Sequence, residues 1–465
     1  MKNPNIILIL IDAVRARNLG CYGYDIETSP NIDKIAEEGI VFENCFSCTN
    51  TTDSSLTTIF SGLYPFNHGI TTHGEKIEKS HLRYLNKIIF LQDILRKNGY
   101  KTLAIDWLSR WHRRGFDYYS GPLDKKRKIF YRFMSNTYTY KLFNNVAGVI
   151  SKFKNDNTIY YDNANSVTNK AINIINKYKN KNFFLFIHYW DTHTPYNPPK
   201  KYLKKLFINN NYNANITIEN ILNSIKNDKW RRYLKKWMLK AKNVEELLAS
   251  YDAELSYIDN EIGRLVEYLN KLEILNDTIL IITSDHGESL IEHGIYFDHH
   301  GLYDVNIHVP LIIRYPEVIH RKKVKSLVQH VDLVPTILEL LEIKYNGRFD
   351  GKSLVMLFEE DIKNFRQFIY TEESYTQRKF AIRTYKYKYI FAPKKEEAIC
   401  RFCGVIHGDF EELYDLENDP EELINIADKN FKTKKELKRL LIKFTNKMEK
   451  QKIKKKIKKI IEKKR

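Results

Sequence analysis

The chain of 465 residues is 43% hydrophobic and 13% aromatic, with a formal net charge of +19. It exceeds the length at which one hydrophobic core stops growing, so we expect a large domain and a smaller one. Its five cysteines are too few for a disulfide framework, no apolar run approaches the ~20 residues of a membrane span, and no signal peptide precedes the first strand, so we expect a cytoplasmic protein.

The first part of the chain alternates between short apolar runs and amphipathic segments. Residues 6–11 predict a buried strand, residues 32–38 and 91–98 predict helices, and residues 101–105 predict another strand. This alternation is typical of a parallel sheet covered by helices on both faces. The sequence therefore predicts an α/β fold.

Two more strands are expected in the middle of the chain, at residues 183–187 and 278–283. A helical period at residues 249–269 leads into the second of them, as in a βαβ unit. A polar stretch rich in Asn, Lys and aromatic residues precedes that helix, and we interpret it as a helical insertion at about 198–245 near the mouth of a site.

Ionisable groups follow three of the predicted strands. They are Asp12, then His188, Asp191 and His193, and finally Asp285 and His286. Because ligands bind at the carboxyl ends of strands in an open α/β sheet, we expect these groups to meet in one metal site. The alternative is that each carboxylate only caps the next helix, which becomes improbable for three strands together.

The pattern changes after about residue 354. Short apolar runs at 368–373, 380–383, 388–391 and 412–414 are separated by charged turns, which predicts a small antiparallel sheet, and C-terminal helices are expected from about Glu421. The predicted division is a large catalytic domain at 1–355, a C-terminal α+β subdomain at 356–432 and a basic helical tail at 433–465.

The end of the chain is strongly basic. From Lys450 to Arg465 ten residues are Lys or Arg, only Glu462 is acidic, and four isoleucines have the spacing of one helical face. Such a helix suits an anionic membrane surface or a nucleic acid. The interpretation we favour is a solvated terminal helix whose isoleucines pack on the domain, and peripheral contact with an anionic membrane is the alternative. No motif with the geometry of specific nucleic-acid binding is present.

A helix predicted to begin near Thr52 bears on catalysis. Leu56, Ile59 and Phe60 share a helical face, which places Thr52 and Asp53 at the N-terminus. A hydroxyl there faces free backbone N–H groups and the positive end of the helix dipole, a place that favours anions. A nearby metal ion would make this hydroxyl reactive near neutral pH, whereas a plain N-cap is the alternative interpretation.

Together these features resemble the sulfatase branch of the alkaline phosphatase superfamily. The matching motifs occur in the family's order up to about Asp428. They include Asp12-Ala13, Ser61-Gly62-Leu63-Tyr64-Pro65, Ser284-Asp285-His286-Gly287-Glu288 and Leu413-Tyr414-Asp415-Leu416. The resemblance implies a three-layer α/β/α sandwich with a mainly parallel sheet, followed by the smaller antiparallel subdomain.

The same resemblance implies roles for individual residues. One divalent ion, Mn, Zn, Mg or Ca, would be bound by Asp12, Thr52, Asp285 and His286, with Thr52 as the nucleophile. His193 would help the leaving group depart, and His299, or its neighbour His300, would hold the anionic group of an ester substrate. Further substrate contacts are expected from His188, Asp191, Arg110 and His112.

Three positions depart from the sulfatase pattern. Sulfatases convert Cys or Ser into formylglycine, an aldehyde that Thr52 cannot form, and Leu56 replaces the arginine that holds it. Ala13 replaces a second metal aspartate. Threonine is the nucleophile of phosphodiesterases in the superfamily, so we expect a sulfatase-like hydrolase of sulfate or phosphate esters without formylglycine. The alternatives are a phosphoryl-headgroup transferase acting on a lipid or glycan, and a non-catalytic binding relative.

Four cysteines form two pairs, Cys45 with Cys48 and Cys400 with Cys403, and His407 follows the second pair. Two such pairs could make a four-thiolate structural zinc site. The long separation between the pairs leaves free thiols in ordinary turns as the alternative.

Overall fold

The computed structural model describes residues 3–73, 85, 88–108, 110–121, 162–318, 322–360, 362 and 365–462, with side chains to residue 449. Its centre is a sheet of eight strands in the order β4-β3-β5-β1-β6-β7-β2-β8. These are β1 (Asn5–Ile11), β2 (Ile40–Phe46), β3 (Lys101–Ile105), β4 (Tyr118–Ser120), β5 (Phe183–Tyr189), β6 (Thr278–Thr283), β7 (Leu311–Arg314) and β8 (Lys322–Gln329).

The middle of this sheet is parallel and buried on both faces. Every residue of β1, β5 and β6 is buried, as their continuous runs of Ile, Leu and Phe require. Strand β1 pairs in parallel with β5 on one side and with β6 on the other. The only antiparallel pairs of this sheet within the described residues involve β7, which lies between β6 and β2.

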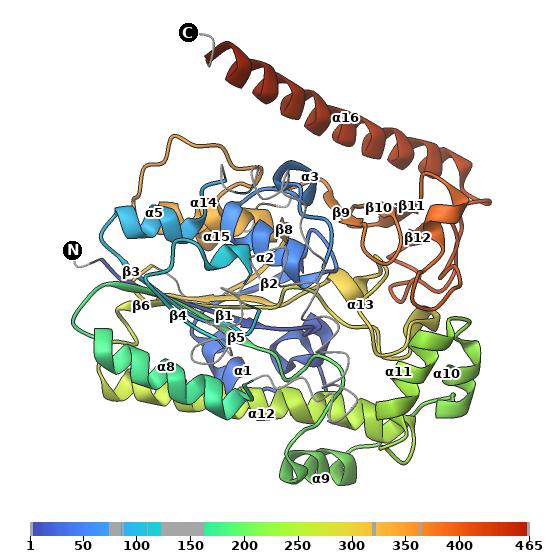
Figure 1. The fold of residues 1–465 in the computed structure, drawn as a ribbon, viewed down its shortest axis with the longest axis horizontal. Helices are drawn as coiled ribbons and strands as arrows, with labels where there is room; N and C mark the ends of the chain where they lie inside the picture. The colour runs from blue at the N-terminus through green and yellow to red at the C-terminus, as the bar shows by residue number, and fades with distance from the viewer. Residues whose placement is uncertain are drawn as a thin grey trace, which may run out of the picture.

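Helices cover both faces of the sheet and make three layers (Figure 1). One face packs against α1 (Pro30–Glu37), α8 (Ala164–Tyr178) and α12 (Val244–Lys271). The other packs against α2 (Thr52–Ser61), α5 (Leu91–Lys97), α14 (Leu333–Leu340) and α15 (Met356–Glu359), with the short α3 (Pro65–His68) following α2. The side chains of alternate residues along each strand enter one core or the other, since successive strand residues point to opposite faces.

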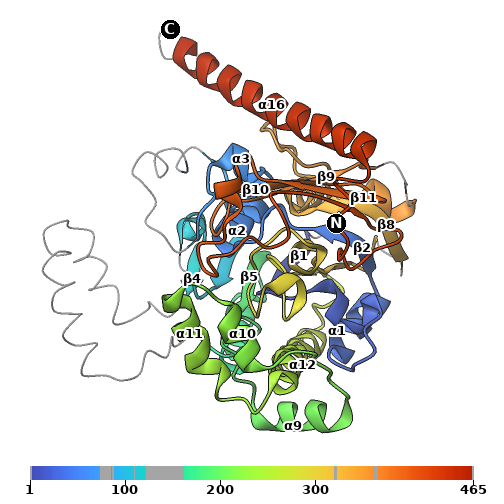
Figure 2. The same ribbon diagram turned by 90° about the vertical axis from the view of Figure 1, so that its right-hand side faces the viewer.

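Three helices lie between β5 and α12, in the stretch where the sequence predicts a helical insertion. They are α9 (Lys200–Asn209), α10 (Ile218–Ser224) and α11 (Asp228–Met238). Helices α10 and α11 share a separate apolar cluster with Cys400 and Cys403 (Figure 2 shows these helices beside the start of α12).

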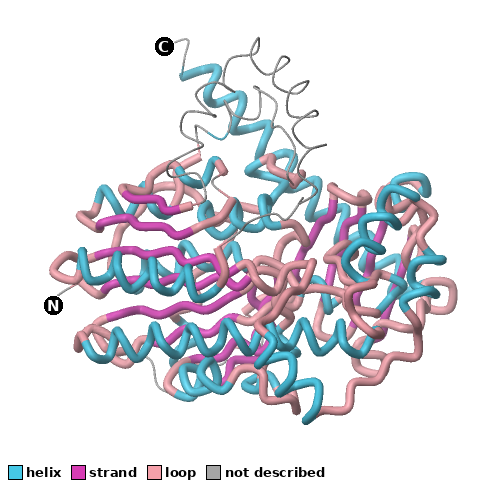
Figure 3. Tube along the Cα trace, turned by 60° about the horizontal axis from the view of Figure 1, so that its bottom comes forward, coloured by secondary structure: helices cyan, strands magenta, loops and turns pink. Residues whose placement is uncertain are grey.

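A second, antiparallel sheet lies beside the first (Figure 3). Its order is β12-β11-β10-β9, with β9 (Ile369–Glu373), β10 (Lys379–Arg383), β11 (Tyr387–Phe391) and β12 (Glu411–Asp415). Helix α16 (Phe431–Glu462) packs its first turns on this sheet through Leu437 and Leu441 and then extends away from the body.

The predicted fold class is confirmed, because a large, mainly parallel sheet with helices on both faces is joined to a small antiparallel sheet. The expectation of helices from about Glu421 is wrong, since α16 begins at Phe431. Ahead of α16, the Asp419 carboxylate accepts hydrogen bonds from the backbone N–H groups of Leu423 and Ile424. Side-chain bonds of this kind compete with helix formation and hold the segment as a turn.

No helix in the described part of the chain combines the length and the apolar composition that crossing a membrane requires. The isoleucine face expected after Lys450 involves side chains outside the described residues. Its contact with an anionic membrane therefore stays a prediction.

Candidate active site

The strand order brings the predicted site residues together. Since β1 lies between β5 and β6, the residues that follow these three strands emerge side by side at one edge of the sheet. Asp12 follows β1, and Asp285 and His286 follow β6. Ala13 turns sharply here, with φ 56°, and its backbone N–H donates to Asp285 Oδ1 over 3.2 Å.

Asp12, Asp285 and His286 form a compact, fully buried group. Each offers one ligand atom, and these atoms lie within 4.8 Å of one another. Among the described residues, Asp12 Oδ1 and Asp285 Oδ2 have no hydrogen-bond partner. Burying two carboxylates with unsatisfied oxygens is costly unless a cation lies between them. Two carboxylates and one imidazole fit a divalent metal ion.

Burial and neighbouring charges shift the pKa values of the two carboxyl groups in opposite directions. Burial and the negative charge of Asp12 raise the pKa of Asp285 above its usual range. Burial alone would also raise the pKa of Asp12, but a hydrogen bond from His188 and the nearby His193 and His286 lower it. Such opposed shifts are typical of functional sites where like charges are held together.

His286 is oriented so that one ring nitrogen faces the group. Its Nδ1 lies 2.9 Å from the carbonyl oxygen of Gly287, which accepts a hydrogen bond from it and leaves Nε2 directed at Thr52 and the carboxylates. Thr52 Oγ1 lies 3.2 Å from that Nε2. Thr52 is the first residue of α2 and is fully buried, so its hydroxyl sits at a helix N-terminus beside the carboxylates.

A chain of buried hydrogen bonds supports Asp12 from behind. His188 Nε2 lies 3.2 Å from Asp12 Oδ2, and His188 Nδ1 lies 2.8 Å from Asp106 Oδ1. Burial would lower the pKa of His188, but the hydrogen bonds to Asp106 and Asp12 outweigh it and raise that pKa to about 10. Two hydrogen bonds to carboxylates and full burial therefore fix His188 in place rather than leaving it open to substrate.

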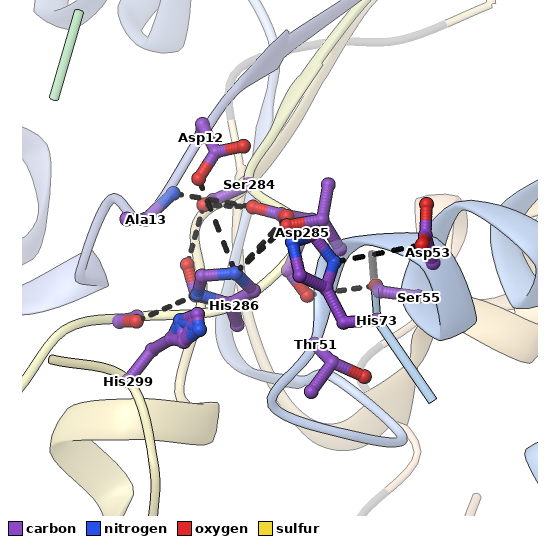
Figure 4. Close-up of polar contacts among 12 residues, drawn as sticks. Asp12, Ala13, Thr51, Asp53, Ser55, His73, Ser284, Asp285, His286 and His299 are labelled. Atoms are coloured by element: carbon purple, nitrogen blue, oxygen red, sulfur yellow. Dashed lines mark hydrogen bonds and ion pairs between the residues drawn. The ribbon is translucent and has the colours of Figure 1, made fainter. Parts of the chain in front are cut away.

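Histidines line the side of the site that faces away from the strands. The His299 ring packs edge-on against His286, with centroids 4.3 Å apart (Figure 4). The His299 ring centroid lies 5.6 Å from that of His193. His193 stacks on Trp190 at 4.7 Å, and its Nδ1 lies 2.8 Å from the Thr194 carbonyl oxygen. Burial and the surrounding histidines hold the pKa of His299 well below its usual range, so His299 is a neutral donor or acceptor.

An arginine and a histidine lie beside Asp53 at the start of α2. Arg110 Nε lies 3.4 Å from Asp53 Oδ1, and His73 Nδ1 lies 3.7 Å from Asp53 Oδ2 (Figure 4 shows the latter pair). The Arg110 guanidinium is partly exposed, which leaves it able to reach an anion at the mouth of the site. Asp53, the residue next to Thr52, therefore holds Arg110 and His73 close to the predicted nucleophile.

Three of the expected substrate-binding residues lie elsewhere. His112 is fully buried, bonded to Asp106 over 2.9 Å and stacked on Phe60. Asp191 accepts a hydrogen bond from the backbone N–H of Ala164 at the start of α8, and burial raises its pKa to about 7. His300 points away from Thr52 toward Cys403, since neighbours in an extended segment face opposite sides, and only His299 enters the site.

The predicted four-cysteine zinc site is also corrected. Cys45 and Cys48 are buried in two other apolar clusters, apart from Cys400 and Cys403. The partners of Cys400 and Cys403 are His300 and His407.

Some functional residues were not expected from the sequence. Asp106 anchors His188, and His73 contacts Asp53 and faces His299 with ring centroids 6.4 Å apart. The only sequence signal for Asp106 is that it directly follows a predicted strand, β3, which pairs with β5. Nothing in the local sequence marks His73.

An α/β/α sandwich with possible metal ligands at the strand ends and a hydroxyl at a helix start is an arrangement that suits ester hydrolysis. Comparison with known families narrows the possibilities. The Sulfatase family model matches residues 4–343, and the model named N-sulphoglucosamine sulphohydrolase, C-terminal, matches residues 291–454. The chain belongs to the sulfatase family, and the expected sulfatase-like ester hydrolase is confirmed at that level.

Individual relatives are distant but cover nearly the whole chain. The chain is 26% identical to N-acetylglucosamine-6-O-sulfatase of Bacteroides thetaiotaomicron, over 95% of this chain and 86% of the relative. It is also 26% identical to an arylsulfatase of Clostridium perfringens, over 91% of this chain and 90% of the relative.

Solved structures show the same fold. A structure in complex with its substrate D-glucosamine-2-N,6-O-disulfate superimposes with a TM-score of 0.70 at 23% identity, covering 97% of this chain and 99% of the other. The phosphonate monoester hydrolase of Agrobacterium radiobacter gives a TM-score of 0.69 at 18% identity, with 96% of each chain covered.

Proposed function

We propose that this sulfatase-family protein hydrolyses sulfate or phosphate esters with Thr52 as the nucleophile and without formylglycine. The observation that carries the proposal is the 3.2 Å separation of Thr52 Oγ1 from His286 Nε2, at the N-terminus of α2 and beside the buried carboxylates. A hydroxyl that served only as a helix cap would not need two unsatisfied carboxylate oxygens beside it.

Asp12, Asp285, His286 and Thr52 would hold the divalent metal ion. When bound, the cation supplies the positive charge that lowers the pKa of the Thr52 hydroxyl and offsets the charge of the ester oxygens. Asp106 and His188 keep the Asp12 carboxylate in one orientation. The Gly287 carbonyl keeps the Nε2 lone pair of His286 directed at the site.

The proposed reaction has two displacements. Thr52 Oγ1, after giving its proton to solvent, attacks sulfur or phosphorus in line; a new Thr52–O–S or Thr52–O–P bond forms and the bond to the leaving oxygen breaks. His193, whose Nδ1–H donates to the Thr194 carbonyl oxygen, acts as the imidazolium and gives its Nε2 proton to the leaving oxygen. The freed Nε2 then takes a proton from water as that water attacks the same sulfur or phosphorus atom; the bond to Thr52 Oγ1 breaks, the inorganic anion is released, and Thr52 regains a proton from solvent.

The anionic part of the substrate would be held by His299 and Arg110. His299 is neutral and buried, so it suits hydrogen bonding to a non-bridging oxygen. Arg110 adds a charge at the partly exposed rim. Threonine favours phosphoryl transfer, which agrees with the fold match to a phosphonate monoester hydrolase, whereas the other relatives carry sulfatase names.

A substrate panel tests the proposal. Aryl sulfate, phosphate monoester, phosphate diester, phosphonate and glucosamine 6-sulfate are each assayed with Mn²⁺, Zn²⁺, Mg²⁺ and Ca²⁺. We expect turnover of at least one ester that is absent in Thr52→Ala, and products formed with and without an acceptor alcohol separate hydrolysis from group transfer. Equal turnover by Thr52→Ala would exclude the proposed nucleophile.

A further inference from the structure

A second group of metal-ligating side chains lies away from Thr52. It consists of His300, Cys400, Cys403 and His407, and their ligand atoms lie within 4.8 Å of one another. All four side chains are buried, and both cysteines are free thiols. Two thiols and two imidazoles buried this close to one another favour a shared ligand.

The separations between ligand atoms match a tetrahedral zinc ion. Zinc bonds of ~2.0–2.1 Å to nitrogen and ~2.3 Å to sulfur require edges of about 3.3 Å between two nitrogens and about 3.6 Å between nitrogen and sulfur. His300 Nε2 and His407 Nε2 are 3.2 Å apart, and Cys403 Sγ and His300 Nε2 are 3.5 Å apart. Two thiolates and two imidazoles are a zinc ligand set, whereas calcium and magnesium prefer oxygen.

The backbone around the two cysteines is folded to present both sulfurs to one point. The N–H of Cys403 donates to Cys400 Sγ over 3.4 Å, and the N–H of Gly404 donates to the Cys400 carbonyl over 2.8 Å. Gly404 has φ 74°, the left-handed region that glycine adopts without strain. An N–H bond to sulfur favours the thiolate, which is the form that binds metal.

A carboxylate lies behind one of the histidines. Asp298 Oδ1 is 3.1 Å from His300 Nδ1, the ring nitrogen on the far side from the cysteines. Histidines that bind metals usually face a carboxylate or carbonyl with their other nitrogen, which orients the ring. The same Asp298 oxygen accepts a hydrogen bond from the backbone N–H of His299 over 2.7 Å.

We propose that His300, Cys400, Cys403 and His407 bind one structural zinc ion, which fastens the loop that carries His299 to the segment between β11 and β12. His299 faces His286 in the active site, while the adjacent His300 faces Cys403. A metal ion bound by His300 and the cysteines would therefore fix the backbone that carries His299. The link between α10 and α11 is held as well, because Lys226 N–H donates to the Cys403 carbonyl and Asn227 Nδ2 donates to the Arg401 carbonyl.

Metal content of the full-length protein tests the zinc site. The background is Asp285→Asn, which weakens the other metal site, and zinc is measured by mass spectrometry after dialysis against a weak chelator. We expect one zinc per chain, close to none in Cys400→Ser/Cys403→Ser, and one again in Cys45→Ala/Cys48→Ala. Equal zinc in the Cys400→Ser/Cys403→Ser variant, or a Cys400–Cys403 disulfide in the purified protein, would overturn the proposal.

Cobalt gives a second readout that does not depend on whether the serine variant folds. Cobalt(II) added to protein freed of zinc should produce the thiolate charge-transfer and strong visible bands of a tetrahedral site with two sulfurs, and His407→Cys should keep zinc while adding a third thiolate band. Weak octahedral cobalt bands, or no thiolate band in wild type, would contradict the assignment.

The effect on the active site rests on the proposed function, whereas the zinc measurement does not. His407→Asn should raise KM for the anionic ester several-fold more than it lowers kcat, because a displaced His299 loses contact with the substrate, and His407→Cys should restore KM. If the protein binds one zinc per chain but His407→Asn has an unchanged KM, the zinc site is supported and its role in positioning His299 is excluded.

Discussion

Thr52 Oγ1 and His286 Nε2 lie 3.2 Å apart although 234 residues separate them in the chain. The contact exists because the start of α2 lies against the segment that follows β6, where the Ser55 hydroxyl donates to the Asp285 carbonyl oxygen over 2.7 Å. It joins the only hydroxyl proposed as a nucleophile to the buried group of Asp12, Asp285 and His286.

Removing the Thr52 hydroxyl should abolish the chemistry and spare the fold. We expect Thr52→Ala to lower kcat by at least about 10³-fold, since no other group replaces a lost nucleophile. Thr52→Ser keeps the hydroxyl, so its kcat should stay within about 10-fold of wild type. A tenfold change in kcat corresponds to ~1.4 kcal/mol in activation free energy. Steady-state rates and thermal unfolding of both variants provide the comparison; a Ser variant as inactive as Ala would speak against a hydroxyl role.

Metal binding should depend on the two carboxylates with unsatisfied oxygens. Asp285→Asn removes one charge from the group and should weaken divalent metal affinity by roughly 10- to 100-fold or more, with activity recovered in part at high metal concentration. Calorimetric titration of metal into chelator-treated protein measures this. Asp252→Asn is the matched control, because that buried carboxylate on α12 is bonded to Asn18, Tyr24 and Tyr212 instead and should keep metal affinity unchanged.

His193 should matter most for poor leaving groups. If it protonates the departing oxygen, His193→Gln should lower the rate by about 10²- to 10⁴-fold for an alkyl ester and by much less for a 4-nitrophenyl ester, whose oxygen leaves without a proton. The slope of log kcat/KM against leaving-group pKa should steepen in the variant. Equal losses for both esters would assign His193 to binding.

Stability at acid pH should depend on Glu292. Its carboxylate lies 2.6 Å from Arg15 Nη1 and accepts hydrogen bonds from two backbone N–H groups. Burial opposes ionisation, but Arg15 and those bonds lower the pKa of Glu292 to about 2 from 4.5. A depressed carboxylate pKa stabilises the fold above the unfolded-state pKa, so the contribution, on the order of 3 kcal/mol, is complete above pH ~5 and is lost as pH falls toward 2.

Urea unfolding across this range checks the Glu292 prediction. The difference in unfolding free energy between wild type and Glu292→Gln should be largest near neutral pH and shrink as the pH falls below ~4.5. Glu436→Gln, on the exposed side of α16, should show no such trend. If the difference in unfolding free energy stays constant with pH, Glu292 stabilises the fold through packing and neutral hydrogen bonds rather than through its charge.

The sequence predicted the parts of the fold that local pattern determines. Strands β1 and β6 are continuous apolar runs because both faces are covered, and such runs are visible without a structure. The antiparallel direction of β7 could not be predicted, since it depends on how the chain crosses between layers rather than on the four residues of the strand.

The site divides in the same way. Asp12, Asp285 and His286 follow strands and converge as expected, because adjacent parallel strands bring their ends together. His188 and His112 both contact Asp106. These contacts depend on how strands and loops pack together, so the spacing of residues in the sequence could not predict them. The pairing of Cys400 and Cys403 with His300 rather than with Cys45 and Cys48 is likewise set by the docking of the small sheet.

The most direct test of Thr52 as nucleophile is capture of the covalent intermediate. Enzyme mixed with a fast phosphate or sulfate ester is quenched in acid within the first turnover, digested and analysed by mass spectrometry. We predict a phosphoryl or sulfuryl group on the peptide that contains Thr52, absent from Thr52→Ala. An active enzyme whose Thr52 peptide stays unmodified, with the group found on another residue or on none, would contradict the account.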